Sequence, residues 1–311
     1  MAAEDRTGAV SVEAMPLVSV VVPAYNAAGS IGETLNALRG QAYRQPFEII
    51  VVDNASTDDT AAVAASYGAT VLRERKRGPS AARNCGLRAA RGEIVAHLDA
   101  DTLPSRRWLR DIAEPFSDPN VRLVAGNTLC YPPKTAAERY VQASKLYDTE
   151  RAIKREEFPF APSLNLAVRR SAALAVGGWD EDMSTGEDVD FSHRILTRFA
   201  THIAYAPGAV LYHHTRADAR ALSKQAWTYG EGAGQLYLRY PDELRWDIRK
   251  SAVLAIRLLD RCSRPPLCAL GRALGIVPGE QLEFVRYQSL WDRHFWAGFF
   301  HMYLLRRRRF T

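Results

Sequence analysis

The chain has 311 residues, of which 47% are hydrophobic and 24% charged, and its formal net charge at pH 7 is +6. This composition is typical of a globular protein with a sizeable core, and its four cysteines lack the paired spacing of a zinc site or a disulfide framework. No interleaving of aromatic and basic residues of the RNA-binding kind is present, so we expect no nucleic-acid partner.

The first part of the chain alternates predicted strands and helices. Residues 1–16 are small and polar and are expected to be disordered. Runs of β-branched residues predict strands at 18–22, 47–53, 69–73 and 93–98, and apolar spacing with capping signals predicts helices at 31–38, up to Tyr67 and at 81–90. Ser56 and Asp59 are candidate caps of the second helix. The alternation predicts an α/β fold with a doubly wound, mostly parallel sheet.

Past Pro104 the predicted elements are less regular. They are a helix containing Trp108, a strand at 121–125, a helix at 135–150, a strand at 163–168, helices at 171–176 and from Glu187, short strands at 202–205 and 209–212 broken by Pro207 and Gly208, and helices at 217–240, 245–261 and 281–309. We therefore expect a main domain at 17–215 and a helical C-terminal extension at 216–311.

Two carboxylates end the predicted strand at 93–98. Asp99 and Asp101 are spaced i, i+2, so both side chains can point the same way just beyond the carboxyl end of the strand, where ligands bind in open α/β sheets. Carboxylates without Cys or His suit Mn²⁺ or Mg²⁺ bound with the help of a ligand's phosphates. The alternative is a solvated turn.

Other polar residues follow neighbouring elements. Asp53 ends the second strand, where it could accept a hydrogen bond from a nucleotide base or cap the next helix. Arg83 lies one turn into a helix, and a guanidinium near a helix N-terminus makes an anion site. His213 and His214 follow the last strand, where an imidazole could complete a metal shell or be structural.

A pair of acidic residues begins the helix after a glycine-containing loop. Glu187 and Asp188 favour a helix N-terminus for dipole reasons alone, but a carboxylate facing a cleft could instead act as a general base. Asp190 is the rival base in the same turn.

Taken together, these motifs carry a resemblance. In chain order they are 18–25, Val-Asp-Asn-Ala-Ser-Thr-Asp at 52–58, Gly-Pro-Ser-Ala-Ala-Arg-Asn at 78–84, Leu-Asp-Ala-Asp at 98–101, Gly-Gly-Trp-Asp-Glu at 177–181 and Gly-Glu-Asp-Val-Asp at 186–190. The ordered set resembles glycosyltransferase family 2, the inverting enzymes with a GT-A nucleotide-sugar-binding fold. The resemblance covers roughly residues 17–215.

The resemblance implies a donor site. Pro23, Tyr25 and Asp53 would hold the nucleoside of a nucleoside-diphosphate sugar, and Arg83 would lie near its base or phosphates. Asp99 would bind the nucleotide sugar and, with its partner in the Asp-x-Asp motif, a divalent metal, Mn²⁺ or Mg²⁺.

The resemblance also implies a catalytic and acceptor side. Asp188 would be the general base that deprotonates an acceptor hydroxyl, and Trp179 and Glu187 would contact the acceptor, a carbohydrate or a lipid-linked molecule. Some relatives add a His as a metal ligand after the last core strands; His213 and His214 are the candidates, and we favour His214.

Processive relatives carry a Gln-x-x-Arg-Trp motif. Here Arg245 and Trp246 are present, but Asp242 replaces the Gln, so we expect one sugar transferred per encounter. Two rival functions are a nucleotidyltransferase, which would need a basic Gly-rich loop after the first strand where the chain has Ala24 to Gly29, and a catalytically idle nucleotide-sugar-binding or scaffold protein of the same fold.

The last predicted helix carries an aromatic stripe. It includes Phe295, Trp296, Phe299 and Phe300 and ends in arginines at 306–309. Such a helix could lie on a membrane surface, or the stripe could pack on the catalytic domain or on a second subunit. Because no secretory signal and no transmembrane stretch is seen, we expect a cytoplasmic protein, with the inner face of the membrane as its possible site.

Overall fold

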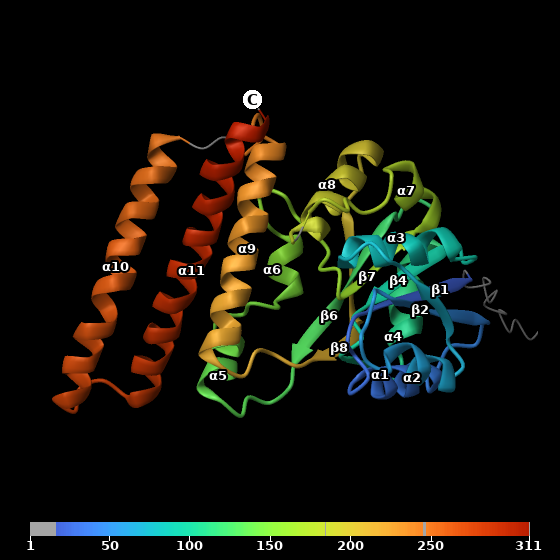
Figure 1. Ribbon diagram of the computed structural model, residues 1–311, viewed down its shortest axis with the longest axis horizontal. Coiled ribbons are helices and arrows are strands. Elements are labelled where there is room, and N and C mark those ends of the chain that lie inside the picture. The colour runs from blue at the N-terminus through green and yellow to red at the C-terminus, as the bar shows by residue number, and fades with distance from the viewer. Residues whose placement is uncertain (1–16, 184, 245–246, 311) are drawn as a thin grey trace, which may run out of the picture.

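The computed structural model describes residues 17–183, 185–244 and 247–310, so the predicted disorder of residues 1–16 lies outside them. Within the described residues an eight-stranded sheet has the order β3-β2-β1-β4-β7-β6-β8-β5 (Figure 1). The strands are β1 (Val18–Ala24), β2 (Phe47–Asp53), β3 (Thr70–Arg73), β4 (Ile94–Leu98), β5 (Thr102–Pro104), β6 (Leu123–Cys130), β7 (Asn165–Arg169) and β8 (Ile203–His213).

The sheet is parallel in its first half and mixed in its second. Strands β3, β2, β1 and β4 pair in parallel, as the strand–helix alternation predicted. Strand β7 then runs antiparallel to both β4 and β6, β6 pairs in parallel with β8, and β5 lies antiparallel at the edge. The parallel half brings the carboxyl ends of β1, β2 and β4 to one edge, where the candidate site lies.

Strand β8 corrects one prediction. The sequence predicted two short strands separated by Pro207 and Gly208, but the structure has one. Ala206 pairs with Gly126 and Val210 with Asn127, so the intervening residues form a bulge against β6 without ending the strand.

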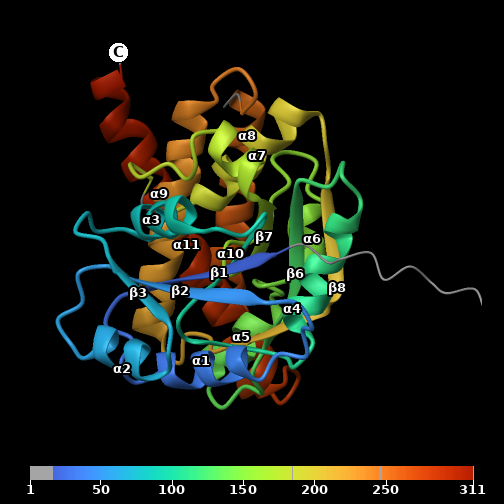
Figure 2. The ribbon, with the colours of Figure 1, turned by 90° about the vertical axis from the view of Figure 1, so that its right-hand side faces the viewer.

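Helices cover both faces of the sheet (Figure 2). On one face α1 (Ile31–Arg39), α2 (Thr60–Ser66) and α4 (Trp108–Ala113, continued by a short 3₁₀ turn at Glu114–Ser117) share a buried apolar cluster with β1. On the other, α3 (Pro79–Ala89), α7 (Arg170–Ala175) and α8 (Glu187–Phe199) share a second cluster with β4 and β7. This packing places α3 and α8 beside the carboxyl ends of the central strands.

Two local predictions are wrong. The helix predicted at 135–150 is two helices, α5 (Ala136–Ala143) and α6 (Thr149–Ile153), because Lys145 adopts a left-handed backbone with φ of 55° between them. Neither Ser56 nor Asp59 caps α2 with its side chain. Instead Asp58 accepts hydrogen bonds from the backbone N–H and hydroxyl of Thr60.

Three long helices complete the chain beside the sheet domain (Figure 1): α9 (Ala219–Arg239), α10 (Ile248–Ala273) and α11 (Gly279–Phe310). Helix α10 was predicted to end at residue 261, but it continues through Pro265 and Pro266. None of the helices in the described residues is long and apolar enough to cross a membrane.

The aromatic stripe of α11 packs on protein. Helix α11 lies against α9, and Phe299 is 1% exposed and contacts the ring of Tyr237 edge-on, with ring centroids 5.3 Å apart. Glycines allow this contact, since a Cβ at Gly230 would lie 1.9 Å from the carbonyl oxygen of Phe295. The structure therefore favours packing on the protein over a membrane-facing stripe; the arginine side chains at 306–309 lie outside the part that it describes.

Candidate active site

A cavity of about 890 Å³ lies at the carboxyl ends of β1, β2 and β4. One wall comes from these strand ends and from the starts of α3 and α8, and the other from α9 and α11. Its lining contains most of the predicted site residues, namely Pro23, Tyr25, Arg83, Asp99, Asp101, Glu187 and Asp188. The three predicted residues or pairs that are not in the lining are Asp53, Trp179 and the two histidines after β8.

Asp99 and Asp101 occupy a tight turn between β4 and β5. The backbone N–H and the hydroxyl of Thr102 both donate to the carbonyl oxygen of Asp99, at 3.3 and 2.7 Å. The hydroxyl of Thr34 lies 3.1 Å from the carbonyl oxygen of Ala100 and 2.8 Å from that of Thr102. These bonds hold the backbone of the turn, so both carboxylates are presented to the cavity.

Arg83 joins the two carboxylate groups of the cavity. Its guanidinium donates to Asp99 at 3.2 Å and to Glu187 at 2.8 Å, and the residue is only 3% exposed. Burial lowers the pKa of Arg83, but the carboxylates of Glu187, Asp99 and Asp188 outweigh burial and raise it overall. A permanent cation thus lies between the end of β4 and the start of α8, as an anion-binding role requires.

Asp188 lies at the floor of the cavity on the first turn of α8. Its carboxylate accepts hydrogen bonds from the backbone N–H groups of Ser163 at 3.3 Å and Val189 at 2.9 Å. Burial first, and then the charge of Glu187, raise the pKa of Asp188 to about 7, against the lowering effect of Arg83 and the two hydrogen bonds. A carboxylate with a pKa near 7 is suited to accept a proton at neutral pH.

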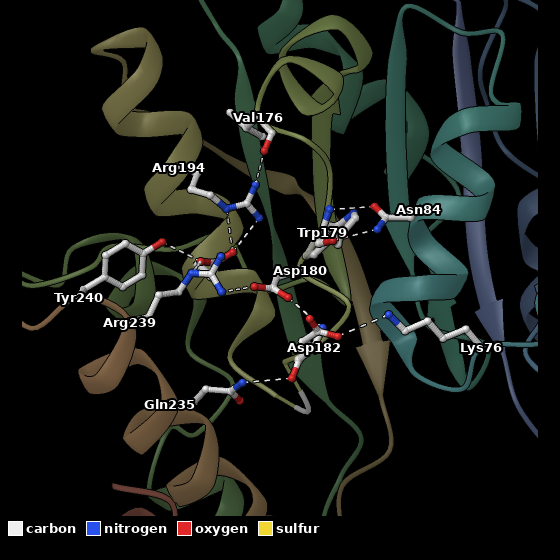
Figure 3. A network of polar contacts seen from close by, with 11 residues as sticks. Lys76, Asn84, Val176, Trp179, Asp180, Asp182, Arg194, Gln235, Arg239 and Tyr240 are labelled. Carbon is white, nitrogen blue, oxygen red and sulfur yellow. Dashed lines mark hydrogen bonds and ion pairs between the residues drawn. The ribbon is translucent and has the colours of Figure 1, made fainter. Parts of the chain in front are cut away.

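Asp190, the rival base, has a structural position instead. It is fully buried, and Arg194 donates to it at 2.8 Å, Arg239 at 3.0 Å and the hydroxyl of Tyr240 at 2.7 Å. Figure 3 shows these three side chains converging from α8 and the end of α9. Asp190 does not line the cavity. It anchors α9 to α8, and its residue type alone could not distinguish this role from catalysis.

Trp179 supports the site from behind. It is 2% exposed, it stacks on Phe191 with ring centroids 4.1 Å apart, and the guanidinium of Arg83 lies 5.0 Å from its ring. Asn84 holds its backbone by accepting from the N–H and donating to the carbonyl, each at 2.8 Å (Figure 3). The structure thus places Trp179 in the core and not at the cavity, where an acceptor contact was expected.

Gly178 explains the double glycine before Trp179. Its φ is 75°, and a Cβ there would lie 2.4 Å from the side-chain oxygen of Asn84. Only glycine combines that backbone with that close approach.

The predicted nucleoside residues are divided between the cavity and its support. Tyr25 is half exposed, and its hydroxyl accepts from Arg77, whose guanidinium lies 4.5 Å from the ring. Asp53 is buried, and it accepts from the backbone N–H of Ser56 at 3.1 Å. Its neighbour Asn54 lines the cavity. Tyr25 therefore presents an open aromatic face, while Asp53 shapes the loop after β2.

The two histidines differ in position. His213 is buried, and its ring lies at a tilt to that of Tyr147, with centroids 4.8 Å apart. Its Nδ1 has no hydrogen-bond partner within the described residues. Burial lowers its pKa, which the charges of Asp101 and Asp99 oppose. His214 is exposed and stacks on Tyr131 at 4.1 Å. The geometry thus brings His213, and not the favoured His214, close to the two carboxylates.

Sequence reasoning missed the residues that line the far side of the cavity. These are Tyr147, Arg155, Arg216, Thr228, Tyr229 and Phe295. They come from α5–α6, from the segment after β8 and from the C-terminal helices. No local motif marks them, because they meet the sheet domain only through long-range packing.

Comparison with known proteins agrees with this geometry. The family model described as glycosyl transferase family 2 matches residues 19–177, about half of the chain. The chain belongs to glycosyltransferase family 2. It is 32% identical over 254 residues to the glycosyltransferase AglE of Haloferax volcanii, covering 79% of this chain and 81% of that relative.

A second relative is the pre-mycofactocin glycosyltransferase of Mycobacterium tuberculosis. It is 33% identical over 240 residues, which is 73% of this chain but 48% of the relative. The chain thus spans about half the length of that relative.

Solved structures show the same fold. The mannosyltransferase PcManGT from Pyrobaculum calidifontis, in complex with GDP-Man and Mn²⁺, matches with a TM-score of 0.64 at 22% identity, covering 92% of this chain and 87% of that chain. Glucosyl-3-phosphoglycerate synthase from Mycobacterium tuberculosis matches at 0.53 and 20%, covering 71% and 79%. The predicted GT-A fold is confirmed, and the chain is a glycosyltransferase.

Proposed function

We propose that this glycosyltransferase is an inverting, metal-assisted enzyme that transfers one sugar per encounter, with Asp188 as its general base. The single observation behind the proposal is Asp188 itself. Its carboxylate lies in the same cavity as the Arg83–Asp99 pair, and its pKa of about 7 lets it take a proton at neutral pH.

The reaction then requires one displacement. Asp188 removes the proton from an acceptor hydroxyl, and the oxygen forms a bond to the anomeric carbon of the donor sugar. The bond from that carbon to the nucleoside diphosphate breaks on the opposite side, and the diphosphate leaves with the electron pair. A single in-line step inverts the anomeric centre. Arg83 stabilises the negative charge that develops on the leaving group, at the helix start where anions bind favourably.

The residues present fit a divalent cation. Asp99 and Asp101 supply hard oxygen ligands in the cavity lining. Buried His213, whose Nδ1 has no hydrogen-bond partner within the described residues, lies outside the lining but close enough for the charges of both carboxylates to raise its pKa against burial. The described residues contain no cluster of three or more His, Cys, Asp or Glu positioned to hold a metal alone, so the donor's phosphates would complete the shell. When bound, Mn²⁺ or Mg²⁺ would neutralise charge on the leaving diphosphate.

The acceptor side has a different character. Tyr147, Tyr229 and Phe295 give it aromatic surface, and Arg155 and Arg216 give it positive charge. A carbohydrate or lipid-linked acceptor that carries a hydroxyl fits this surface. Single transfer rests on Asp242 in place of the Gln of the processive motif, whose Arg245 and Trp246 lie outside the described residues.

Donor turnover tests the proposal. Purified protein would be incubated with UDP-, dTDP- and GDP-sugars, and release of the nucleoside diphosphate would be followed with Mn²⁺, with Mg²⁺ and with chelator. We expect slow hydrolysis of one donor, abolished by chelator and lost in Asp188→Asn and Asp99→Ala. The anomeric configuration of the product sugar, read by NMR, tests inversion. Turnover that survives Asp188→Asn would disprove the general-base role, and binding of every nucleotide without turnover would favour the idle scaffold.

A further inference from the structure

The exposed apolar side chains of the molecule concentrate on α10. Of the large apolar residues that are exposed in the described part of the chain, half lie between positions 253 and 276. They are Val253 at 48%, Ile256 at 67%, Leu259 at 72%, Leu267 at 64%, Leu270 at 61%, Leu274 at 65% and Ile276 at 74%. Large exposed apolar patches on a folded protein mark contacts with a partner or a membrane.

Apart from Ile276, which lies beyond the end of the helix, these residues share one face of α10. At 3.6 residues per turn, the positions from 253 to 274 fall within about a third of the circumference of the helix. Leu254, which is 5% exposed, lies on the opposite side, where α10 contacts α11. Figure 1 shows α10 as the outermost helix, separated from the sheet domain by α11 and α9. Nothing in the described residues covers the apolar face.

Basic residues accompany this face. Helix α10 contains six Arg or Lys residues and one acidic residue, Asp260. Three of the basic residues form salt bridges: Arg264 with Asp260 at 2.9 Å, Arg261 with Asp292 of α11 at 3.2 Å and Lys250 with Glu157 at 3.6 Å. The basic residues are Arg249, Lys250, Arg257, Arg261, Arg264 and Arg272. An amphipathic helix of about 39 Å with an apolar face and a basic polar side is the pattern of helices that lie in the interface of a bilayer.

We propose that α10 lies on an anionic membrane surface, with the face from Val253 to Leu274 among the acyl chains and its arginines at the lipid headgroups. Charge decides between a membrane and a second copy of the chain. Arg249, Arg257 and Arg272 form no salt bridge within the described residues, so two copies meeting face to face would oppose two helices of net positive charge and repel, whereas an anionic bilayer attracts them. The proposal corrects the earlier expectation for the aromatic stripe of α11, which is buried against α9, and it does not rest on the proposed reaction.

Vesicle binding by the full chain tests the proposal. Co-sedimentation would use vesicles of neutral phosphatidylcholine and of phosphatidylcholine with phosphatidylglycerol. The variant would be Ile256→Glu/Leu259→Glu/Leu270→Glu, and the matched control Leu174→Glu, an apolar residue on α7 that is 42% exposed. We expect the wild type and the control to bind anionic vesicles and the triple variant to bind at least tenfold less.

The changed side chains are already in water, so the triple variant should fold; circular dichroism and gel filtration check this. Wild-type protein that stays in the supernatant, or a folded triple variant that binds as well as the wild type, would overturn the proposal. A wild-type dimer that the triple variant converts to a monomer would assign the face to self-association and also overturn it.

Charge provides a second, independent measurement. Arg249 and Arg272 are exposed, and Arg249→Gln/Arg272→Gln removes two charges while every apolar side chain of α10 is kept. Each juxtamembrane arginine should contribute about fivefold to affinity for anionic vesicles at low salt. We expect the double variant to bind these vesicles more weakly and to lose part of the salt dependence. Equal binding to neutral and anionic vesicles would contradict the role of the arginines.

Discussion

The cavity has two unlike walls. The wall from the sheet domain holds ionisable side chains, including Arg83, Asp99 and Asp188, each fixed by ion pairs or backbone hydrogen bonds. The wall from α9 and α11 holds Tyr229 and Phe295 and depends on close packing between glycines and backbone. The first wall supplies charged side chains, and the second supplies aromatic surface. Substitutions can disrupt each wall separately.

The largest effect is expected from Asp188→Asn in the charged wall. Removing the proposed general base should lower donor turnover by about 10²–10⁴-fold. The backbone N–H groups of Ser163 and Val189 donate to different carboxylate oxygens, so the single amide oxygen of Asn keeps only one of these hydrogen bonds, and we expect a small loss of stability with the fold kept. Nucleoside diphosphate release at saturating donor measures the first effect, and thermal unfolding measures the second. A variant with intact turnover would show that the base lies elsewhere.

The next effect is on stability and comes from Asp190→Asn. This change leaves Arg194 and Arg239 beside a neutral side chain in a buried network. Because both arginines retain some access to water, we expect the lower end of the range for breaking a buried ion pair, a loss of about 3 kcal/mol in the free energy of unfolding. Urea denaturation measures it. Asp182→Asn is the control, since that side chain is 91% exposed and should change little.

These two aspartates show what the sequence could and could not predict. The alternating strands and helices followed from apolar periodicity, and the place of Asp99 and Asp101 followed from the rule that ligands bind at the carboxyl ends of the strands. The family resemblance implied that Arg83 and Asp188 belong to the same site. Residue type and spacing alone did not decide between Asp188 and Asp190. Side chains two residues apart on a helix point in very different directions, and the elements that pack around the helix determine which of them faces the cavity. Trp179 shows the same gap.

The second wall was not predictable from local patterns. The stripe of α11 was recognised as apolar, but its partner α9 was not identified, because the contact is made by glycines that leave no periodic signal. The length of α10 was not predicted either. The helix was expected to end at residue 261 and instead continues through two prolines. Long-range packing, not propensity, decided these elements.

Gly230→Ala should disrupt the wall formed by α9 and α11, which we call the packed wall. A Cβ at this position would lie 1.9 Å from the carbonyl oxygen of Phe295, a backbone atom that cannot move away alone. Helix α11 must shift from α9, which should lower the free energy of unfolding by about 1–3 kcal/mol. Denaturant unfolding measures the loss. Gly29→Ala is the control, since a Cβ there meets nothing within 4 Å, and an equal loss in both variants would remove the packing explanation.

The pH dependence of turnover should depend on both walls of the cavity, because both affect the pKa of Asp188. With the pKa of Asp188 at about 7, its carboxylate becomes protonated as the pH falls, so turnover should drop about tenfold per pH unit below 7. The neighbouring charges are Glu187, which raises this pKa, and Arg83, which lowers it. Burial raises the pKa of Tyr229 in the packed wall, and the charge of Asp188 adds to this rise. Burial lowers the pKa of Arg155, and the charge of Asp188 opposes this fall.

Burial is the largest cause of the raised pKa of Asp188, and the packed wall contributes to that burial. Gly230→Ala should admit water, lower the pKa toward the ordinary carboxyl value and move the acid limb of the profile to lower pH. The expected shift is smaller than the effects above, but its direction is informative. If Glu187 alone held the pKa high, loosening the packed wall would leave the acid limb where it is, and the packed wall would have no part in tuning the base.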